Sequence, residues 1–268
     1  MGLFTRMSNG WQLTKASFGV LKHDKEILVL PVLSFLTLVL FMGFWLGAGF
    51  FTLGLPAGDP TALHYVLLFI LYVGMAWVGT FFLAATVAMA TIRLDGGDPT
   101  LKDGLSAAWD RKGKLLAWAL VSATVGILLR ALRERAGALG QIAVGLAELG
   151  WAVATYFVVP ILVYQDIGPL DAVKKSASHI KRTWGEAATG VFSTGTIFFL
   201  LGLVGLVPLV LGLISGSSTL FLVGIAVAVL YWIVLAAANS AVKGILVAAL
   251  YRYADTGELP SAFQAARV

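Results

Sequence analysis

The sequence contains no cysteine, little charge and only three histidines, and each shortage excludes a class of protein or site. Without cysteine there are no disulfides, thiolate metal sites or cysteine nucleophiles. Charged residues make up 12% of the 268 residues and hydrophobic ones 59%, with a mean hydropathy of +0.90. A soluble domain is about a quarter charged, and a disordered chain is poor in apolar residues. The composition therefore indicates a multi-pass membrane protein.

Residue combinations that carry catalysis or bind cofactors are also missing from the sequence. His23, His64 and His179 lie far apart, and none has a second histidine at ligand spacing. We find no phosphate-binding glycine loop, serine–histidine–aspartate order or zinc signature. The turn from Asp95 to Asp98 holds two acids, which make a poor calcium loop and favour a turn and capping role. We therefore expect no enzyme activity, catalytic residue, cofactor or metal, and no nucleic-acid partner.

Apolar runs long enough to cross a membrane recur along the chain. A hydrocarbon core about 30 Å thick needs about 20 apolar residues of helix. The runs are continuously apolar, whereas membrane β-strands alternate between apolar and polar residues. We predict an all-α fold, a polytopic membrane helical bundle that forms a single transmembrane domain over residues 1–268. The predicted transmembrane helices are at about 27–51, 65–92, 115–132, 142–164, 191–214 and 219–251. The last is too long for a straight crossing and should tilt or continue beyond the membrane.

Lysine and arginine are distributed unequally over the two sides that six crossings define. Of the 19 such residues, 16 belong to the side of the two termini and of the loops after the second and fourth helices, counting Lys243, which lies near that side within the sixth helix. The other three, Arg130, Arg133 and Arg135, lie on the opposite side. Positively charged segments remain preferentially in the cytoplasm. We therefore predict that both termini are cytoplasmic.

Three cytoplasmic segments, at about 7–23, 100–111 and 169–184, combine apolar residues at helical spacing with cations off that face. We predict that they are amphipathic helices in the membrane interface, the second opened by a capping box of Thr100 and Asp103. Their tryptophans would lie at the headgroups and their lysines would reach lipid phosphates. The predicted interfacial anchors are Trp11, Lys15, Lys22, Trp109, Lys174, Lys175, Lys181 and Trp184. The alternative, compatible with this interpretation, is that the apolar stripes pack on the ends of the bundle.

Ionisable residues inside the predicted spans are functional candidates, because charge is costly to bury in lipid. A hairpin between the third and fourth spans would bring Glu148 close to Arg130 and Arg133. These residues could form an anion or proton path, but we favour an ion pair that holds the hairpin. Asn239 and Lys243, near the inner end of the sixth span, favour interhelical hydrogen bonding and snorkelling over substrate coordination.

Proline and glycine predict local features of the bundle. Pro160 should kink the fourth span near its cytoplasmic end, because proline lacks an N–H group and clashes with the preceding turn. Two glycine pairs, Gly43 with Gly47 and Gly212 with Gly216, have the spacing that lets membrane helices approach closely. Such pairs act either within the chain or between subunits.

The stretch from Tyr156 to Ser176, followed by Thr183-Trp-Gly-Glu186, resembles the central signature of an uncharacterised prokaryotic six-helix membrane family, a domain of unknown function. Gln165 departs from that pattern, in which we expect an acid. The layout is more distantly similar to the membrane domain of glycerophosphodiester phosphodiesterases, whose catalytic acids belong to a separate soluble domain. The resemblance implies a topology and a place in the prokaryotic cytoplasmic membrane, and no activity. Further matching pieces run from Gly10 through Glu26, from Trp118 through Gly126 and from Tyr251 to Gly257.

Together these features predict an integral membrane protein without a catalytic site, acting as a structural or accessory subunit of a membrane assembly. The alternative function is a transporter or a lipid-handling protein. The expected partners are anionic lipid headgroups at the cytoplasmic face, and further candidates are other membrane subunits or a second copy of the chain.

Overall fold

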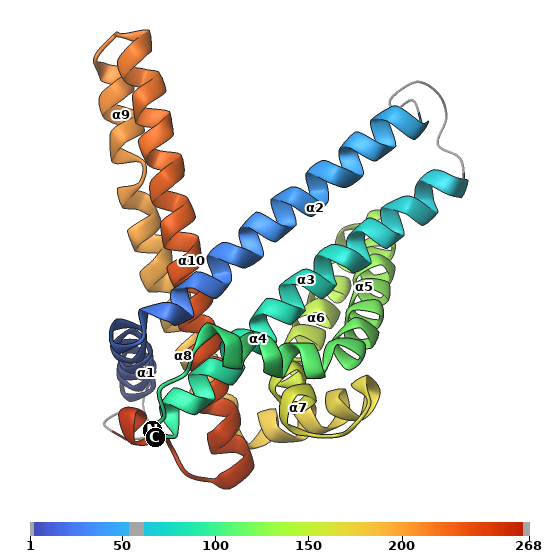
Figure 1. Cartoon of the computed structure of the whole chain (residues 1–268), viewed down its shortest axis with the longest axis vertical. Helices are drawn as coiled ribbons and strands as arrows, with labels where there is room; N and C mark the ends of the chain where they lie inside the picture. The colour runs from blue at the N-terminus through green and yellow to red at the C-terminus, as the bar shows by residue number, and fades with distance from the viewer. Residues whose placement is uncertain (1–2, 54–61, 265–268) are drawn as a thin grey trace. The chain divides into compact units, whose positions relative to one another are not determined.

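A computed structural model describes the backbone of residues 3–53 and 62–264, and the side chains of 11–48, 62–181 and 188–264. Within these ranges the secondary structure is helical and contains no strand, which confirms the predicted all-α class (Figure 1). The elements are α1 (Leu3–His23), η1 (Lys25–Leu28), α2 (Val29–Leu53), α3 (Ala62–Leu94), α4 (Leu101–Asp110), α5 (Lys112–Arg135), α6 (Ala138–Ala154), α7 (Val158–Tyr164), α8 (Pro169–Val204), α9 (Val207–Ile214), α10 (Ser218–Thr256) and η2 (Ser261–Phe263).

Six segments of the described chain are helical, long and apolar enough to cross a membrane, as expected of a multi-pass membrane protein. Each overlaps one predicted transmembrane helix. The last segment, α10, has 39 residues, or about 58 Å at 1.5 Å per residue, and so is longer than one straight crossing requires. The six segments are Lys25–Ala48, Ala62–Leu94, Lys112–Arg135, Ala138–Tyr164, Ala188–Ile214 and Ser218–Thr256.

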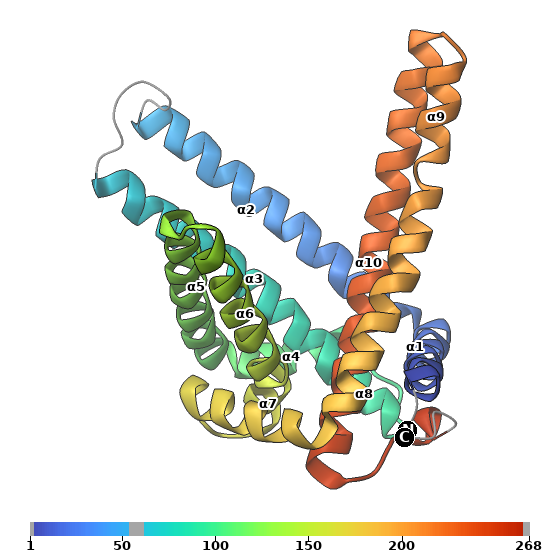
Figure 2. The same cartoon turned by 180° about the vertical axis from the view of Figure 1, so that it is seen from behind.

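The chain divides into two compact units, and each is described by itself. Unit 1 comprises Met1–Pro31, Ala90–Asp98 and Thr183–Val268, and unit 2 comprises Val32–Met89 and Pro99–Arg182. In unit 1, α9 lies beside α10, and α1 packs against the other end of α10 (Figure 1). In unit 2, α5 and α6 form an antiparallel hairpin (Figure 2).

The amphipathic helix α1 packs on other helices of unit 1, which supports the alternative interpretation of its apolar stripe. Its Thr14 hydroxyl lies 2.9 Å from the hydroxyl of Thr194 in α8, and both residues are fully buried. Trp11, predicted to be on the apolar face, is exposed, because α10 and α8 cover a neighbouring face instead. From residue 11 onward, where the side chains of α1 are described, the buried residues are Leu13, Thr14, Ser17, Val20 and Leu21.

The amphipathic segment that begins α8 shows a similar shift. Leu170, one of its apolar residues, is 65% exposed, whereas Ala172 and Ser176 are fully buried. This segment is not a separate helix ending near residue 184, because α8 runs continuously from Pro169 to Val204. No proline separates the predicted interfacial helix from the predicted span, so one helix serves both.

Two of the spans are interrupted just before a proline. The predicted kink at Pro160 is confirmed, because α6 ends at Ala154 and α7 begins only at Val158. Proline prevents a regular helical bond to the carbonyl four residues earlier, so the preceding turn opens. The backbone N–H of Phe157, inside this interruption, donates to the buried Ser176 hydroxyl at 3.0 Å. A side chain from α8 thus replaces a lost helical acceptor.

The second interruption was not predicted, and it corrects the expected continuous span 191–214. Here α8 ends at Val204 and α9 begins at Val207, with Pro208 in its first turn. Two carbonyls left without regular helical donors are bonded by side chains of α10. Tyr231 donates from its hydroxyl to Leu201 at 2.7 Å, and Trp232 donates from Nε1 to Gly202 at 3.0 Å.

The glycine pairs have different roles in the structure. A Cβ added at Gly212 would lie 2.8 Å from the Cα of Phe221, so this glycine allows α9 and α10 to approach within the chain. Gly216 adopts a φ of 66° in the turn between the same helices. By contrast, a Cβ at Gly43 or Gly47 would meet no described atom within 4 Å.

Candidate functional site

The predicted ion pair of the third and fourth spans forms across the α5–α6 hairpin. The Arg133 guanidinium contacts the Glu148 carboxylate, and their side chains are 49% and 35% exposed within the chain. Arg130 does not join this pair. It bonds Glu134, one turn further along α5, at 3.0 Å, because that carboxylate lies on the same helical face. The site is therefore one interhelical pair beside one intrahelical pair.

Asn239 and Lys243, the other predicted intramembrane residues, belong to α10 in unit 1. The Lys243 side chain is exposed, as snorkelling requires. The buried Oδ1 atom of Asn239 accepts no hydrogen bond from any described residue. The arginines and Glu148 belong to unit 2, so the predicted polar residues form two separate groups.

A buried ion pair in unit 1 was missed by the sequence analysis. Asp24, between α1 and η1, has a side chain that is 7% exposed, and its Oδ2 atom lies 3.3 Å from Nε of Arg93 at the end of α3. Arg93 also donates to the Gly97 carbonyl at 3.1 Å and lies 3.5 Å from Asp98. Burial raises the pKa of Asp24, although the Arg93 charge opposes this shift, and the Asp98 and Glu26 charges add to it.

The turn after α3 is held by a further ion pair. Asp95 pairs with Arg252 of α10, so both acids of this turn face arginines. Among the described residues, no group of three or more histidine or acidic side chains is arranged to hold a metal ion. The turn contributes ion pairs that join α3, the α1–η1 junction and α10 within unit 1.

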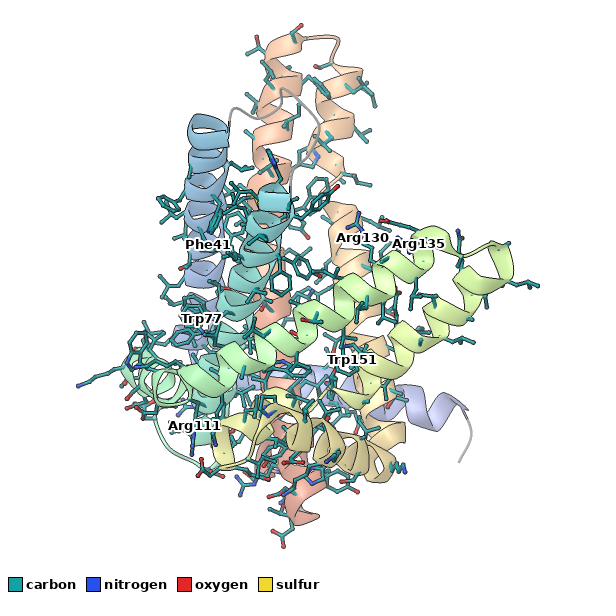
Figure 3. The ribbon with its side chains drawn as sticks, turned by 90° about the vertical axis from the view of Figure 1, so that its right-hand side faces the viewer. Phe41, Trp77, Arg111, Arg130, Arg135 and Trp151 are labelled. Carbon is teal, nitrogen blue, oxygen red and sulfur yellow. The ribbon has the colours of Figure 1, made fainter. Side chains whose placement is uncertain are left out.

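A second charged cluster lies in unit 2, at the start of α5. Nη1 of Arg111 is 3.2 Å from Oδ1 of Asp166, and its Nε donates to the Val163 carbonyl at 3.2 Å. Lys114 bonds the same carboxylate oxygen. The hydrogen bond and charge of Lys114, helped by Arg111, hold the pKa of Asp166 below its usual range. Figure 3 shows Arg111 at one end of α5, with Arg130 and Arg135 toward the other.

The predicted interfacial anchors occupy different environments. On α1, Trp11, Lys15 and Lys22 are exposed. The predicted capping box of Thr100 and Asp103 is confirmed, and it opens the helix that carries Trp109. On α8, Lys174 is bonded to Asp171 at 3.0 Å, Lys175 is partly exposed and Lys181 is exposed. The side chain of Trp184 lies outside the described residues.

The sequence predicts those contacts of these sites whose residues lie close together along the chain. The Arg133–Glu148 pair follows from one hairpin turn, and the capping box lies within four residues. The Asp24–Arg93 pair joins residues far apart in the sequence. The one signal for it was an acid a few residues before an apolar run, because such an acid needs a cation nearby if it becomes buried.

Comparison with known families gives one match. Residues 62–261, about three quarters of the chain, match DUF6159, a family of unknown function. No curated protein matches the chain. The more distant similarity to the membrane domain of glycerophosphodiester phosphodiesterases gains no support from this comparison and stays a prediction. The match and the six candidate spans agree with the predicted uncharacterised membrane family, and the chain belongs to the DUF6159 family of unknown function.

Proposed function

We propose that the chain is a non-enzymatic membrane protein that serves as a structural or accessory subunit of a membrane assembly. The main support is the large apolar surface that its spans leave uncovered. In the most apolar window of each span, between 11% and 39% of the residues are buried within the chain. Apolar surface of this extent must contact lipid or the spans of another protein. In a subunit of an assembly, this apolar surface would pack against the helices of partner subunits.

The charged residues support the same role. Several cations at the span ends face carboxylates of the chain itself, as in the pairs Arg93–Asp24, Arg111–Asp166 and Arg133–Glu148. Ion pairs of this kind join different elements of the chain, two of the three across long stretches of sequence, and so would hold these elements together. We therefore assign Arg133 and Glu148 a structural role in holding the α5–α6 hairpin.

Purification at native abundance tests the subunit role. The tagged chain would be extracted from its own membrane in native nanodiscs, and the co-purifying proteins quantified by mass spectrometry. We expect a membrane protein present in a constant ratio to the chain. A tagged membrane protein of the same abundance and unrelated sequence is the control. A chain that emerges alone or only with the control's contaminants would contradict the proposal.

Transport or lipid handling is the second candidate, and the two interrupted spans favour it. Interrupted helices line substrate pathways in many transporters. In this chain, side chains bond groups at both interruptions, as Ser176 does with the N–H of Phe157. Liposomes containing the purified chain would be compared with empty liposomes. Solute flux or lipid movement above the empty control would favour this candidate over the subunit role.

For the environment of the protein, we propose the prokaryotic cytoplasmic membrane with both termini in the cytoplasm. The support is the concentration of 16 of the 19 lysines and arginines on one predicted side. The proposed lipid partners are anionic phospholipids, attracted by that basic side. Other membrane subunits or a second copy of the chain are the proposed protein partners.

A further inference from the structure

The corner between α4 and α5 presents an aromatic ring and a lysine together at the surface. Trp109 is 55% exposed, and the Nζ atom of Lys112 lies 4.2 Å from the centre of its ring. The ring is held from behind by an edge-to-face contact with Phe81, with centroids 6.4 Å apart. Nε1 of Trp77 also donates to the Lys112 carbonyl at 3.4 Å. The ring and the ammonium group therefore have a defined arrangement.

The neighbouring cations are each bonded to a carboxylate of the chain, but Lys112 is not. Arg111 and Lys114 share the carboxylate of Asp166. No carboxylate of the described residues lies within ion-pair distance of Lys112, and the first turn of α5 contains no acid. A Cβ added at Gly113 would meet no described atom within 4 Å, so the space beside Lys112 is open. Lys112 therefore has no ion-pair partner among the described residues, and the space beside it has room for an anion.

An exposed apolar stripe leads from Lys112 along α5. Its members up to Ile127 recur every three or four residues and are exposed, whereas Leu115 and Ala119, which directly precede two of them, are buried. Lys112 is the first residue of the span Lys112–Arg135, so the lysine lies at the boundary and the stripe inside the apolar segment. From its first to its last leucine the stripe extends about 18 Å, close to the roughly 15 Å of one leaflet's hydrocarbon. Its members are Leu116, Leu120, Thr124, Ile127 and Leu128.

We propose that the α4–α5 corner is a binding site for one anionic phospholipid. The lipid phosphate contacts Lys112 beside Trp109, and an acyl chain lies along the stripe that begins at Leu116. The hydroxyl of Thr124 is already bonded to the Leu120 carbonyl at 2.8 Å, so the stripe presents no unpaired donor to the acyl chain. The charge at one end and the apolar length of the stripe fit a lipid better than a free anion. This inference rests on the lipid contact proposed above and is independent of the subunit role.

Native mass spectrometry of the purified full chain tests the site. Phosphatidylglycerol and phosphatidylcholine with identical acyl chains would be titrated separately, and the dissociation constant of the tightest-bound lipid determined. We expect a preference for phosphatidylglycerol that K112Q weakens about fivefold, since a lysine near the membrane surface contributes about 1 kcal/mol to anionic lipid binding. W109L should weaken this preference by a smaller factor, and K112R should retain the preference. K243Q, which removes an exposed lysine from α10, is the matched control and should leave it unchanged.

Two further measurements distinguish the lipid from other ligands. Inorganic phosphate should fail to displace phosphatidylglycerol, because it cannot use the apolar stripe. L116Q should weaken the binding of both lipids by the same factor, because it alters the contact with the acyl chain and not the charge. An unchanged phosphatidylglycerol affinity in K112Q would overturn this site alone. No headgroup preference in the wild-type chain would overturn both the site and the proposed anionic-lipid contact, while leaving the subunit role to its own test.

Discussion

The two ends of α5 hold their arginines in different ways. At its start, Arg111 faces Asp166, which lies 55 residues further along the chain, after α7. At its end, Arg133 faces Glu148 only 15 residues away, across one turn. The predicted cytoplasmic end therefore joins distant segments, whereas the opposite end closes a single hairpin. Removal of the Arg111–Asp166 pair should therefore disturb more of the fold than removal of the Arg133–Glu148 pair.

The ion pairs of the chain also differ in how deeply their carboxylates are buried. The side chain of Asp24 is 7% exposed and that of Asp166 is 86% exposed, although each carboxylate faces an arginine. Burial raises the pKa of the first, and nearby positive charges lower the pKa of the second. The same pair of residue types thus carries an electrostatic penalty in unit 1 and a favourable interaction in unit 2.

The largest effect is expected from R93Q, which leaves the buried Asp24 carboxylate without a cation. We expect a loss of about 3 kcal/mol in the free energy of unfolding, measured by denaturant titration in nanodiscs. Asp24→Asn alone should change stability by less, because it removes the charge whose burial is unfavourable. The double variant should recover most of the loss. If R93Q and wild type unfold at the same denaturant concentration, the buried pair has no structural importance.

A smaller loss of stability is expected from E148Q, which breaks the pair between α6 and the opposite end of α5. The pair with Arg133 is partly exposed within the chain and joins only adjacent helices, so we expect a loss of about 1 kcal/mol. Unfolding in nanodiscs measures this loss, and Glu134→Gln, which breaks only the intrahelical pair with Arg130, is the control for charge removal. Loss of a transport activity in liposomes with unchanged stability would instead support a proton or anion path.

The pH dependence should distinguish the two aspartates. Because the folded-state pKa of Asp24 is raised, the stabilisation from its protonation is complete below the ordinary value of 3.8 and is lost as the pH rises through the raised value. The pKa of Asp166 is lowered, so its stabilisation is present above 3.8 and is lost as the pH falls through the lowered value. Asp24→Asn should therefore flatten the stability curve above 3.8, and Asp166→Asn should flatten it below.

Stability measured between about pH 3 and pH 7 in the same nanodiscs checks these slopes. The wild-type chain provides the reference curve for both variants. If Asp24→Asn instead flattened the stability curve below 3.8, burial would not control the protonation of Asp24.

Local features of the fold could be predicted from the sequence, because their determinants are close together. The capping box of Thr100 and Asp103 needs only one helical turn, and the interruption before Pro160 follows from the missing N–H of proline. The spans follow from the length of apolar runs alone. The Arg133–Glu148 pair follows from the hairpin that such runs impose.

Features that depend on a distant partner could not be predicted. Helical periodicity shows that one face of α1 is apolar, but α10 and α8 determine that Leu13 and Ser17 are buried and Trp11 is not. At the interruption after Val204, Pro208 is a local determinant like Pro160, but the bonds from Tyr231 and Trp232, which lie 30 residues from the carbonyls they contact, could not be predicted. Asp24 and Arg93 carry no local signal that identifies them as partners.

Cysteine labelling tests most directly the central claim, that the chain crosses the membrane six times with its basic segments on the cytoplasmic side. The native chain has no cysteine, so single cysteines can be introduced without background at exposed positions. The positions are Lys102, Leu139, Ser178, Ser218 and Glu258. In right-side-out vesicles, an impermeant maleimide should label L139C and S218C at once, and the other three only after permeabilisation. Labelling of K102C and L139C from the same side would contradict the account, because α5 would then not cross the membrane.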